Sequence, residues 1–161
     1  MQKNNYSIIS FILIALVLFS RLIPHQPNFT PLIAVVLFSS MMFKGKRYIL
    51  IPILALFLSD VLLQYYGGYQ YLFSSTFFWT YSSLFLVFLF SYFYNNKMTS
   101  RNVFINSFAG AVIFFLVSNF GVWISSSGFY PFNLSGLIAC YTAAIPFFRN
   151  TLSSTVIYSA I

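Results

Sequence analysis

The sequence predicts an all-α membrane protein with about six transmembrane helices, and two observations lead to this class. Of the 161 residues, 60% are hydrophobic and only 6% are charged, whereas a soluble domain is about one quarter charged. Long apolar runs are separated by short basic, Pro-containing or Gly-containing breaks, which is the usual layout of a protein that crosses a membrane several times. We therefore expect residues 1–161 to form a single transmembrane domain.

The first apolar run, residues 8–19, has the length of a signal-peptide core. However, Phe19-Ser20-Arg21 lacks the small residues of a cleavage site, and the chain stays apolar afterwards. We therefore expect a retained first span. Charge, Pro and Gly then set the boundaries of the expected spans, which are residues 6–22, 32–43, 48–65, 72–94, 103–123 and 134–161, the last broken near residue 146.

The last segment is unusual because its apolar part before Arg149 is short. Residues 134–148 would form a helix about 22 Å long, against a hydrocarbon core of about 30 Å. We expect this segment to enter partly, to break near Pro146 and to cross once from about Asn150. Arg149 and Asn150 would then lie near an outer cavity, where Pro146 frees backbone carbonyls. A full crossing would instead make Arg149 a cytoplasmic flank.

Basic residues predict the orientation, because cytoplasmic loops are enriched in Lys and Arg. The densest basic loop contains Lys44, Lys46 and Arg47 and is expected to be cytoplasmic. The N-terminus and the loop of residues 95–101 then also fall inside, while residues 66–71 and 125–132 fall outside. The predicted location is the cell inner (plasma) membrane, with several crossings and a cytoplasmic N-terminus. Arg21 and Arg149 are the basic residues outside this pattern.

Asp60 is the only carboxylate side chain of the chain, and it lies within the third expected span. A charge inside a span costs about 2.5–3.5 kcal/mol on insertion scales, so it should face a cavity or a partner. Two interpretations stay open. Asp60 either serves a functional site or forms an ion pair that only fixes the packing.

Polar and aromatic residues gather at the outer ends of the expected spans. Arg21 lies near His25 and Asn28, and Asn119 and Trp123 are one helical turn apart. Arg21 could equally be an interfacial side chain that extends to water, and the aromatic residues could form a belt at the membrane interface. We nevertheless expect a polar pocket that opens outward. Further aromatic residues at this level are Tyr66, Tyr69, Tyr71 and Tyr130.

The residues that carry most catalytic chemistry are scarce. One His, one Asp and no Glu leave no acid–base pair to spare, so we predict no enzyme. A zinc site needs about four ligands, and only Cys140, His25 and Asp60 are available, so we expect no metal. No Gly-rich phosphate loop is present, and we expect no other cofactor. The basic residues punctuate apolar runs rather than cluster on one face, which argues against nucleic acid as a partner.

The last third of the chain carries a resemblance to a known family. Asn119-Phe120, Tyr130-Pro131, Tyr141 and Ile145-Pro146-Phe147 follow in that order. This order resembles the substrate-binding S subunits of energy-coupling-factor (ECF) vitamin transporters, in particular the riboflavin-binding type. In that type an Asn stands where this chain has Phe148, so the resemblance does not imply riboflavin.

Two further strings, Pro27-Asn28-Phe29-Thr30-Pro31 and Ser118-Asn119-Phe120-Gly121-Val122-Trp123, are similar to those of small uncharacterised bacterial membrane proteins assigned to transport. The ECF resemblance implies six spans, both termini inside, and a substrate pocket roofed by the loop of residues 21–31. It also implies a coupling subunit with ATPases as partner, besides the lipid bilayer and a small-molecule substrate.

Our leading hypothesis is a substrate-binding membrane subunit of an uptake transporter for a small metabolite or vitamin-like molecule. The candidate substrate-binding residues are Arg21, Asn28, Asp60, Asn119, Trp123, Tyr141, Arg149 and Asn150. Two alternatives stay open. One is a structural or assembly subunit of a membrane complex, and the other is an ion-coupled carrier in which Asp60 titrates.

Overall fold

The computed structural model describes residues 2–42, 46–68, 72–94, 98–125 and 128–161. Within these ranges the regular secondary structure is helical, and no strand is present. A helix lies on each of the six expected spans. The helices are α1 (Gln2–Leu22), α2 (Leu32–Met42), α3 (Leu50–Gly67), α4 (Ser75–Tyr94), α5 (Ser100–Ser125) and α6 (Leu134–Ala160), and a short 3-10 helix, Lys46–Ile49, precedes α3.

Local capping sets several helix ends. Ser74 precedes α4, and its hydroxyl accepts a hydrogen bond from the backbone N–H of Phe77 at 3.2 Å. Asn133 precedes α6 in the same way, since its Oδ1 accepts from the N–H of Gly136 at 2.9 Å. These side chains satisfy backbone donors that a helix start leaves without partners. Gly68 ends α3 with a left-handed φ of 68°, a conformation that glycine adopts without strain.

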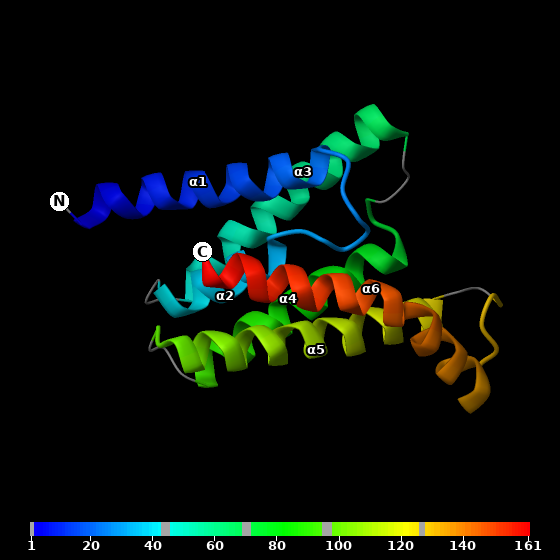
Figure 1. The fold of residues 1–161 in the computed structure, drawn as a ribbon. Helices are drawn as coiled ribbons and strands as arrows, with labels where there is room; N and C mark the ends of the chain where they lie inside the picture. Colours follow the sequence, from blue (N-terminus) through cyan, green and yellow to red (C-terminus); the bar gives the residue numbers. More distant parts are fainter. Residues whose placement is uncertain (1, 43–45, 69–71, 95–97, 126–127) are drawn as a thin grey trace.

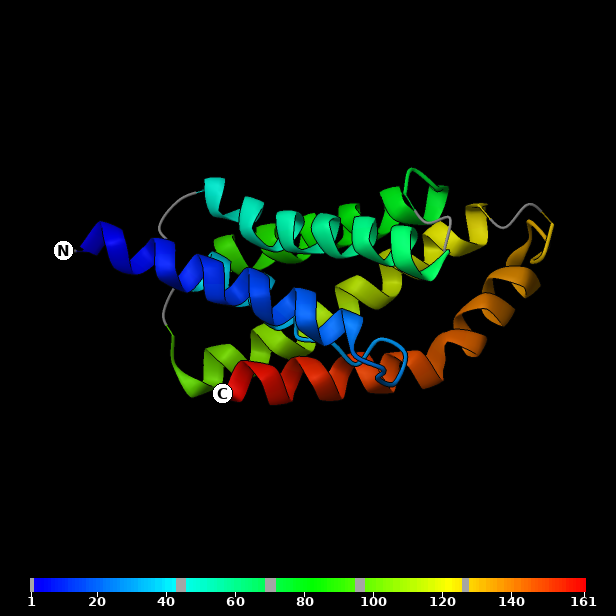
Figure 2. The same ribbon diagram turned by 90° about the horizontal axis from the view of Figure 1, so that it is seen from above.

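The predicted break near Pro146 is wrong, because α6 is one continuous helix from Leu134 to Ala160 with Pro146 inside it. Figures 1 and 2 show α6 changing direction between its orange first half and its red second half. A proline removes one backbone hydrogen bond and pushes against the preceding turn, which bends a helix without necessarily ending it. The residues on both sides of Pro146 remain helical through the bend.

The helices run back and forth, so that both termini lie at the same end of the bundle (Figures 1 and 2). The opposite end carries the loop of residues 23–31 between α1 and α2, and we call it the α1–α2 loop end. The starts of α4 and α6 lie at this end as well. Chain segments far apart in sequence therefore meet there.

The short helix α2 occupies the centre of the bundle. Its 11 residues are apolar on nearly every side, and most of them are buried, as expected for a helix without a polar face. It packs against α3, α4, α5 and α6, and Val36 is fully buried in a core with Leu56 of α3 and Phe88 of α4. The hydroxyl of Ser40 donates to Ser91 Oγ of α4 at 2.6 Å and joins the two helices inside this core.

Three helices, α3, α4 and α5, are long and apolar enough to cross a membrane. Helix α1 contributes a shorter apolar stretch, Ser7–Leu22, and packs mainly along α3. Large apolar side chains such as Phe11 on α1 and Phe108 on α5 are more than half exposed. Exposed apolar surface on this scale indicates association with a membrane rather than with water.

Helices α4 and α5 are in close contact at Gly121 and Trp79. A Cβ atom added there would lie 2.1 Å from Cγ of Trp79, which no real contact allows. We predict that Gly121→Ala lowers the thermal stability of the protein in detergent. Overpacking costs about 1–3 kcal/mol and exceeds the roughly 1 kcal/mol that alanine gains over glycine inside a helix.

Gly110→Ala is the matched control, because it lies on the same helix and is also buried. Its added Cβ would lie 3.2 Å from Cγ1 of Val87, a side-chain tip that can shift by a few tenths of an ångström. Thermal melting of both variants in one detergent checks the packing. Equal melting temperatures for the two variants would contradict the close contact at Trp79.

Candidate functional site

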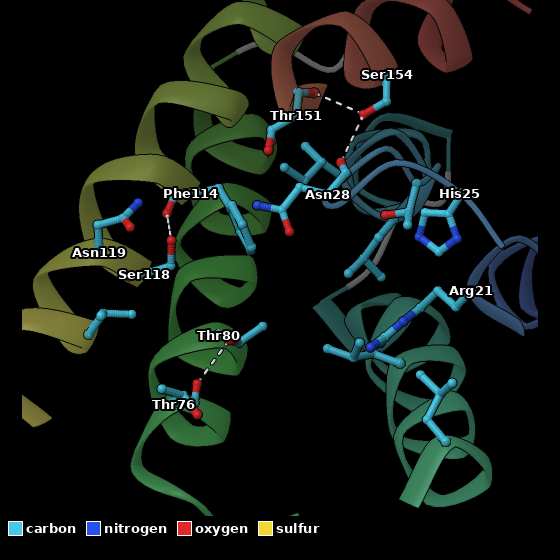
Figure 3. A pocket seen from close by; sticks show the side chains of 16 residues that line it. Arg21, His25, Asn28, Thr76, Thr80, Phe114, Ser118, Asn119, Thr151 and Ser154 are labelled. Atoms are coloured by element: carbon cyan, nitrogen blue, oxygen red, sulfur yellow. Dashed lines mark hydrogen bonds between the residues drawn. The ribbon is translucent and has the colours of Figure 1, made fainter. Parts of the chain in front are cut away.

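A cavity of about 470 Å³ lies beneath the α1–α2 loop (Figure 3). All six helices contribute to its wall, and hydroxyl and amide side chains make up much of it. Its volume falls in the range of small-molecule sites, which is about 300–1,000 Å³. The lining residues are Arg21, His25, Asn28, Thr30, Leu32, Ile33, Leu56, Leu63, Thr76, Thr80, Phe114, Ser118, Asn119, Val122, Thr151 and Ser154.

Arg21 at the end of α1 is held by an ion pair with Asp60 of α3. Arg21 Nη2 lies 2.7 Å from Asp60 Oδ1, and the hydroxyl of Tyr81 on α4 donates to Asp60 Oδ2 at 3.0 Å. Asp60 is 1% exposed, so its charge is compensated by these neighbours rather than by water. The carboxylate therefore lies behind Arg21 and not in the lining, while Arg21 itself faces the cavity.

The second terminal nitrogen of Arg21 has no such partner. Nη1 is buried and makes no hydrogen bond within the part of the chain that the structure describes. A guanidinium group is a donor only, and a buried donor without an acceptor costs about 1–3 kcal/mol or more when charged. Nη1 is therefore an unsatisfied donor of a side chain that lines the cavity, and an acceptor that reaches it would gain a hydrogen bond.

The α1–α2 loop is tied to α6 by polar contacts. Asn150 Nδ2 donates to the carbonyl oxygen of Pro27 at 3.0 Å, and the hydroxyl of Ser154 lies 3.4 Å from the carbonyl oxygen of Asn28. Asn28 itself has a left-handed φ of 63°, which Asn tolerates better than most residues. The loop thus has a defined shape and forms one side of the cavity.

Helices α5 and α6 form a polar wall in which most hydroxyl protons are already used. Ser118 donates to the carbonyl oxygen of Phe114 at 2.6 Å, and Asn119 Nδ2 donates to that of Phe115 at 2.8 Å. Thr151 Oγ1 donates to the carbonyl oxygen of Phe147 at 2.9 Å. Figure 3 shows Ser118 and Asn119 on α5 across the cavity from Arg21.

The structure brings together some of the residues that the sequence singled out and leaves others apart. Arg21, Asn28 and Asn119 line the cavity, Asp60 lies behind Arg21, and Asn150 holds the loop.

Like Asp60 and Asn150, the other three candidates lie outside the cavity lining. Trp123 Nε1 donates to the carbonyl oxygen of Pro131 at 3.0 Å, and the hydroxyl of Tyr141 donates to that of Leu116 at 2.6 Å. Trp123 thereby connects α5 to the segment that precedes α6, and Tyr141 connects α6 to α5. Arg149 is exposed.

Sequence reasoning missed the hydroxyl residues of the cavity, Thr30, Thr76, Thr80, Ser118, Thr151 and Ser154. A signal was present, because Thr76 and Thr80 are four residues apart and Thr151 and Ser154 three apart, which places each pair on one helix face. Tyr66 is exposed and lies outside the lining. Tyr69, Tyr71, Lys44 and Lys97 lie outside the described residues.

The ion pair yields a test of stability. We predict that Asp60→Asn destabilises the protein by about 3–5 kcal/mol, because it leaves the Arg21 charge without its partner. The double variant Arg21→Met/Asp60→Leu should regain most of this loss, since it removes both charges. Thermal melting of the single and double variants in detergent measures the coupling. A double variant less stable than Asp60→Asn would contradict the pairing.

Comparisons with known proteins complete this description. No curated protein and no solved structure matches the chain. One family model matches residues 1–161. The chain therefore belongs to the family of unknown function DUF6580.

Proposed function

We propose that this protein is the substrate-binding membrane subunit of an uptake transporter for a small metabolite or vitamin-like molecule. One observation carries the proposal: a cavity of about 470 Å³ with many hydroxyl and amide side chains in its wall, in a chain that is 60% hydrophobic. Polar groups among membrane helices are costly, and they usually mark a substrate or ion site. Packing alone needs no cavity, whereas a binding subunit needs one of this size and chemistry.

The proposed orientation puts the α1–α2 loop end outside the cell and both termini in the cytoplasm. The protein would be a multi-pass protein of the bacterial inner (plasma) membrane with about six crossings. The start of α5, which contains Arg101, and the 3-10 helix Lys46–Ile49 lie at the end of the bundle that carries the termini. This position agrees with the positive-inside rule. Arg149 directly precedes Asn150, whose side chain contacts the α1–α2 loop. In this orientation Arg149 would therefore lie in the outer half of the membrane.

The cavity residues then have distinct roles. The substrate enters beneath the α1–α2 loop and meets Asn119 and Arg21 on opposite sides. Asp60 keeps Arg21 in position through the ion pair, and Asn150 keeps the loop in position. Arg149, Trp123 and Tyr141 have no direct role at the substrate in this proposal.

Energy for uptake would come from a partner. The chain has no nucleotide-binding loop, and its resemblance to ECF S subunits supports a coupling subunit with ATPases. An ion-coupled carrier is the second candidate. The buried carboxylate of Asp60 favours it, because loss of the negative charge on protonation would weaken the hold on Arg21. Uptake by the purified protein in liposomes without any ATPase would identify the carrier.

Native mass spectrometry of the gently extracted protein tests the proposal. We expect a small molecule or an ATPase module to remain bound. Asn119→Ala should weaken binding of that small molecule about 3- to 10-fold, the effect of one hydrogen bond.

Asn106→Ala is the matched control. Asn106 lies on the same helix, donates to the carbonyl oxygen four residues earlier like Asn119, and does not line the cavity. A protein that carries no small molecule and retains only protein partners other than an ATPase module would instead be a structural subunit.

A further inference from the structure

We infer that the cavity binds a molecule of zero net charge with two unlike ends. One end donates hydrogen bonds, as an ammonium or hydroxyl group does, and lies against α5 and α6. The other end accepts them, as a carboxylate or carbonyl group does, and lies against Arg21. This inference rests on the proposed function and specifies its substrate class.

The α5–α6 wall selects the donating end. Each hydroxyl group has one proton, and the protons of Ser118 and Thr151 are used on carbonyl oxygens of their own helices. Ser154 Oγ likewise donates to the carbonyl oxygen of Thr151 at 3.0 Å. Asn119 uses one of its two amide protons on Phe115 and keeps its carbonyl oxygen. The wall therefore offers mainly lone pairs to a ligand, and lone pairs require donors.

The opposite wall selects the accepting end. Arg21 has no lone pair to offer, its Nη2 is taken by Asp60, and its Nη1 is buried without a partner in the described part of the chain. His25, farther along the same side in Figure 3, has its Nδ1 2.7 Å from the carbonyl oxygen of Ile23. A carbonyl oxygen only accepts, so this ring nitrogen carries the proton.

The charges on the cavity select zero net charge for the ligand. The positive charge of Arg21 is balanced by Asp60, and apart from the exposed ring of His25 the other lining side chains are neutral. A dianion would find one cation that is already paired. A dication would find no free carboxylate, because Asp60 also accepts from Tyr81. Burial of a net charge without a counter-charge is expensive.

A matched set of linear molecules tests the ligand class. The probes are ω-amino acids of three to six carbons (β-alanine to 6-aminohexanoate), and diamines and dicarboxylates of the same lengths. Thermal shift in detergent reports binding. We expect at least one amino acid to raise the melting temperature more than its diamine and its dicarboxylate do. Equal shifts within every length, or no shift with any probe, would overturn the inference.

Two variants test the two ends. Thr151→Val keeps the side-chain shape but removes the oxygen at the cavity, and it should weaken binding of the best amino acid about 3- to 10-fold. Thr155→Val is its matched control, because Thr155 donates to the carbonyl oxygen four residues earlier like Thr151 and lies outside the lining. Arg21→Lys keeps a charge for Asp60 but loses the forked second donor, and it should weaken binding by a similar factor.

Failures of the two proposals can be told apart. A diamine or dicarboxylate that binds best, and whose binding Asn119→Ala weakens, would leave the binding site in place and overturn the ligand class. If Thr151→Val and Thr155→Val weaken ligand binding equally, the α5–α6 wall does not bind the donating end of the ligand. No probe bound, together with no small molecule retained in native mass spectrometry, would overturn both proposals.

Discussion

The ion pair between Arg21 and Asp60 determines how the α1–α2 loop end of this bundle is built. It joins α1 to α3, and Tyr81 adds α4 through the same carboxylate. In apolar surroundings each charge would be very costly alone, so the three helices must meet where these side chains meet. Arg21 is thereby placed at the edge of the cavity, and the loop that follows it must pass over the cavity. The Arg21–Asp60 ion pair therefore helps to determine where the cavity lies.

The short length of α2 imposes a second constraint. A helix of 11 residues is only about 16 Å long, so the remaining distance is covered by the loop of residues 23–31. The backbone groups of a loop lack the partners that a helix supplies and are paired with side chains or water instead. On α6, the side chain of Asn150 donates to the carbonyl oxygen of Pro27. Polar residues on α6 therefore serve the backbone as well as the cavity.

Much of the helical layout could be predicted from the sequence, because apolar runs and their polar breaks depend on neighbouring residues alone. The break at Pro146 could not, since the outcome depends on how the flanking helix packs through the bend. Asp60 was expected to face a cavity or form an ion pair, but nothing in the sequence names Arg21 as its partner. The tryptophan at 123 was expected at the substrate because aromatic rings stack on ligands. It instead donates to Pro131, a contact that only the folded chain reveals.

The same guanidinium group can serve both the fold and the site because its nitrogens are separate donors. Nη2 meets Asp60 while Nη1 makes no hydrogen bond in the described part of the chain, so an acceptor that reaches Nη1 does not require the ion pair to open. A ligand in the proposed position would then add a fourth partner to the contact of α1, α3 and α4. Its binding would stabilise the end of α1 and, through it, the start of the loop. Occupancy of the cavity and the position of α1 would consequently be coupled through one side chain.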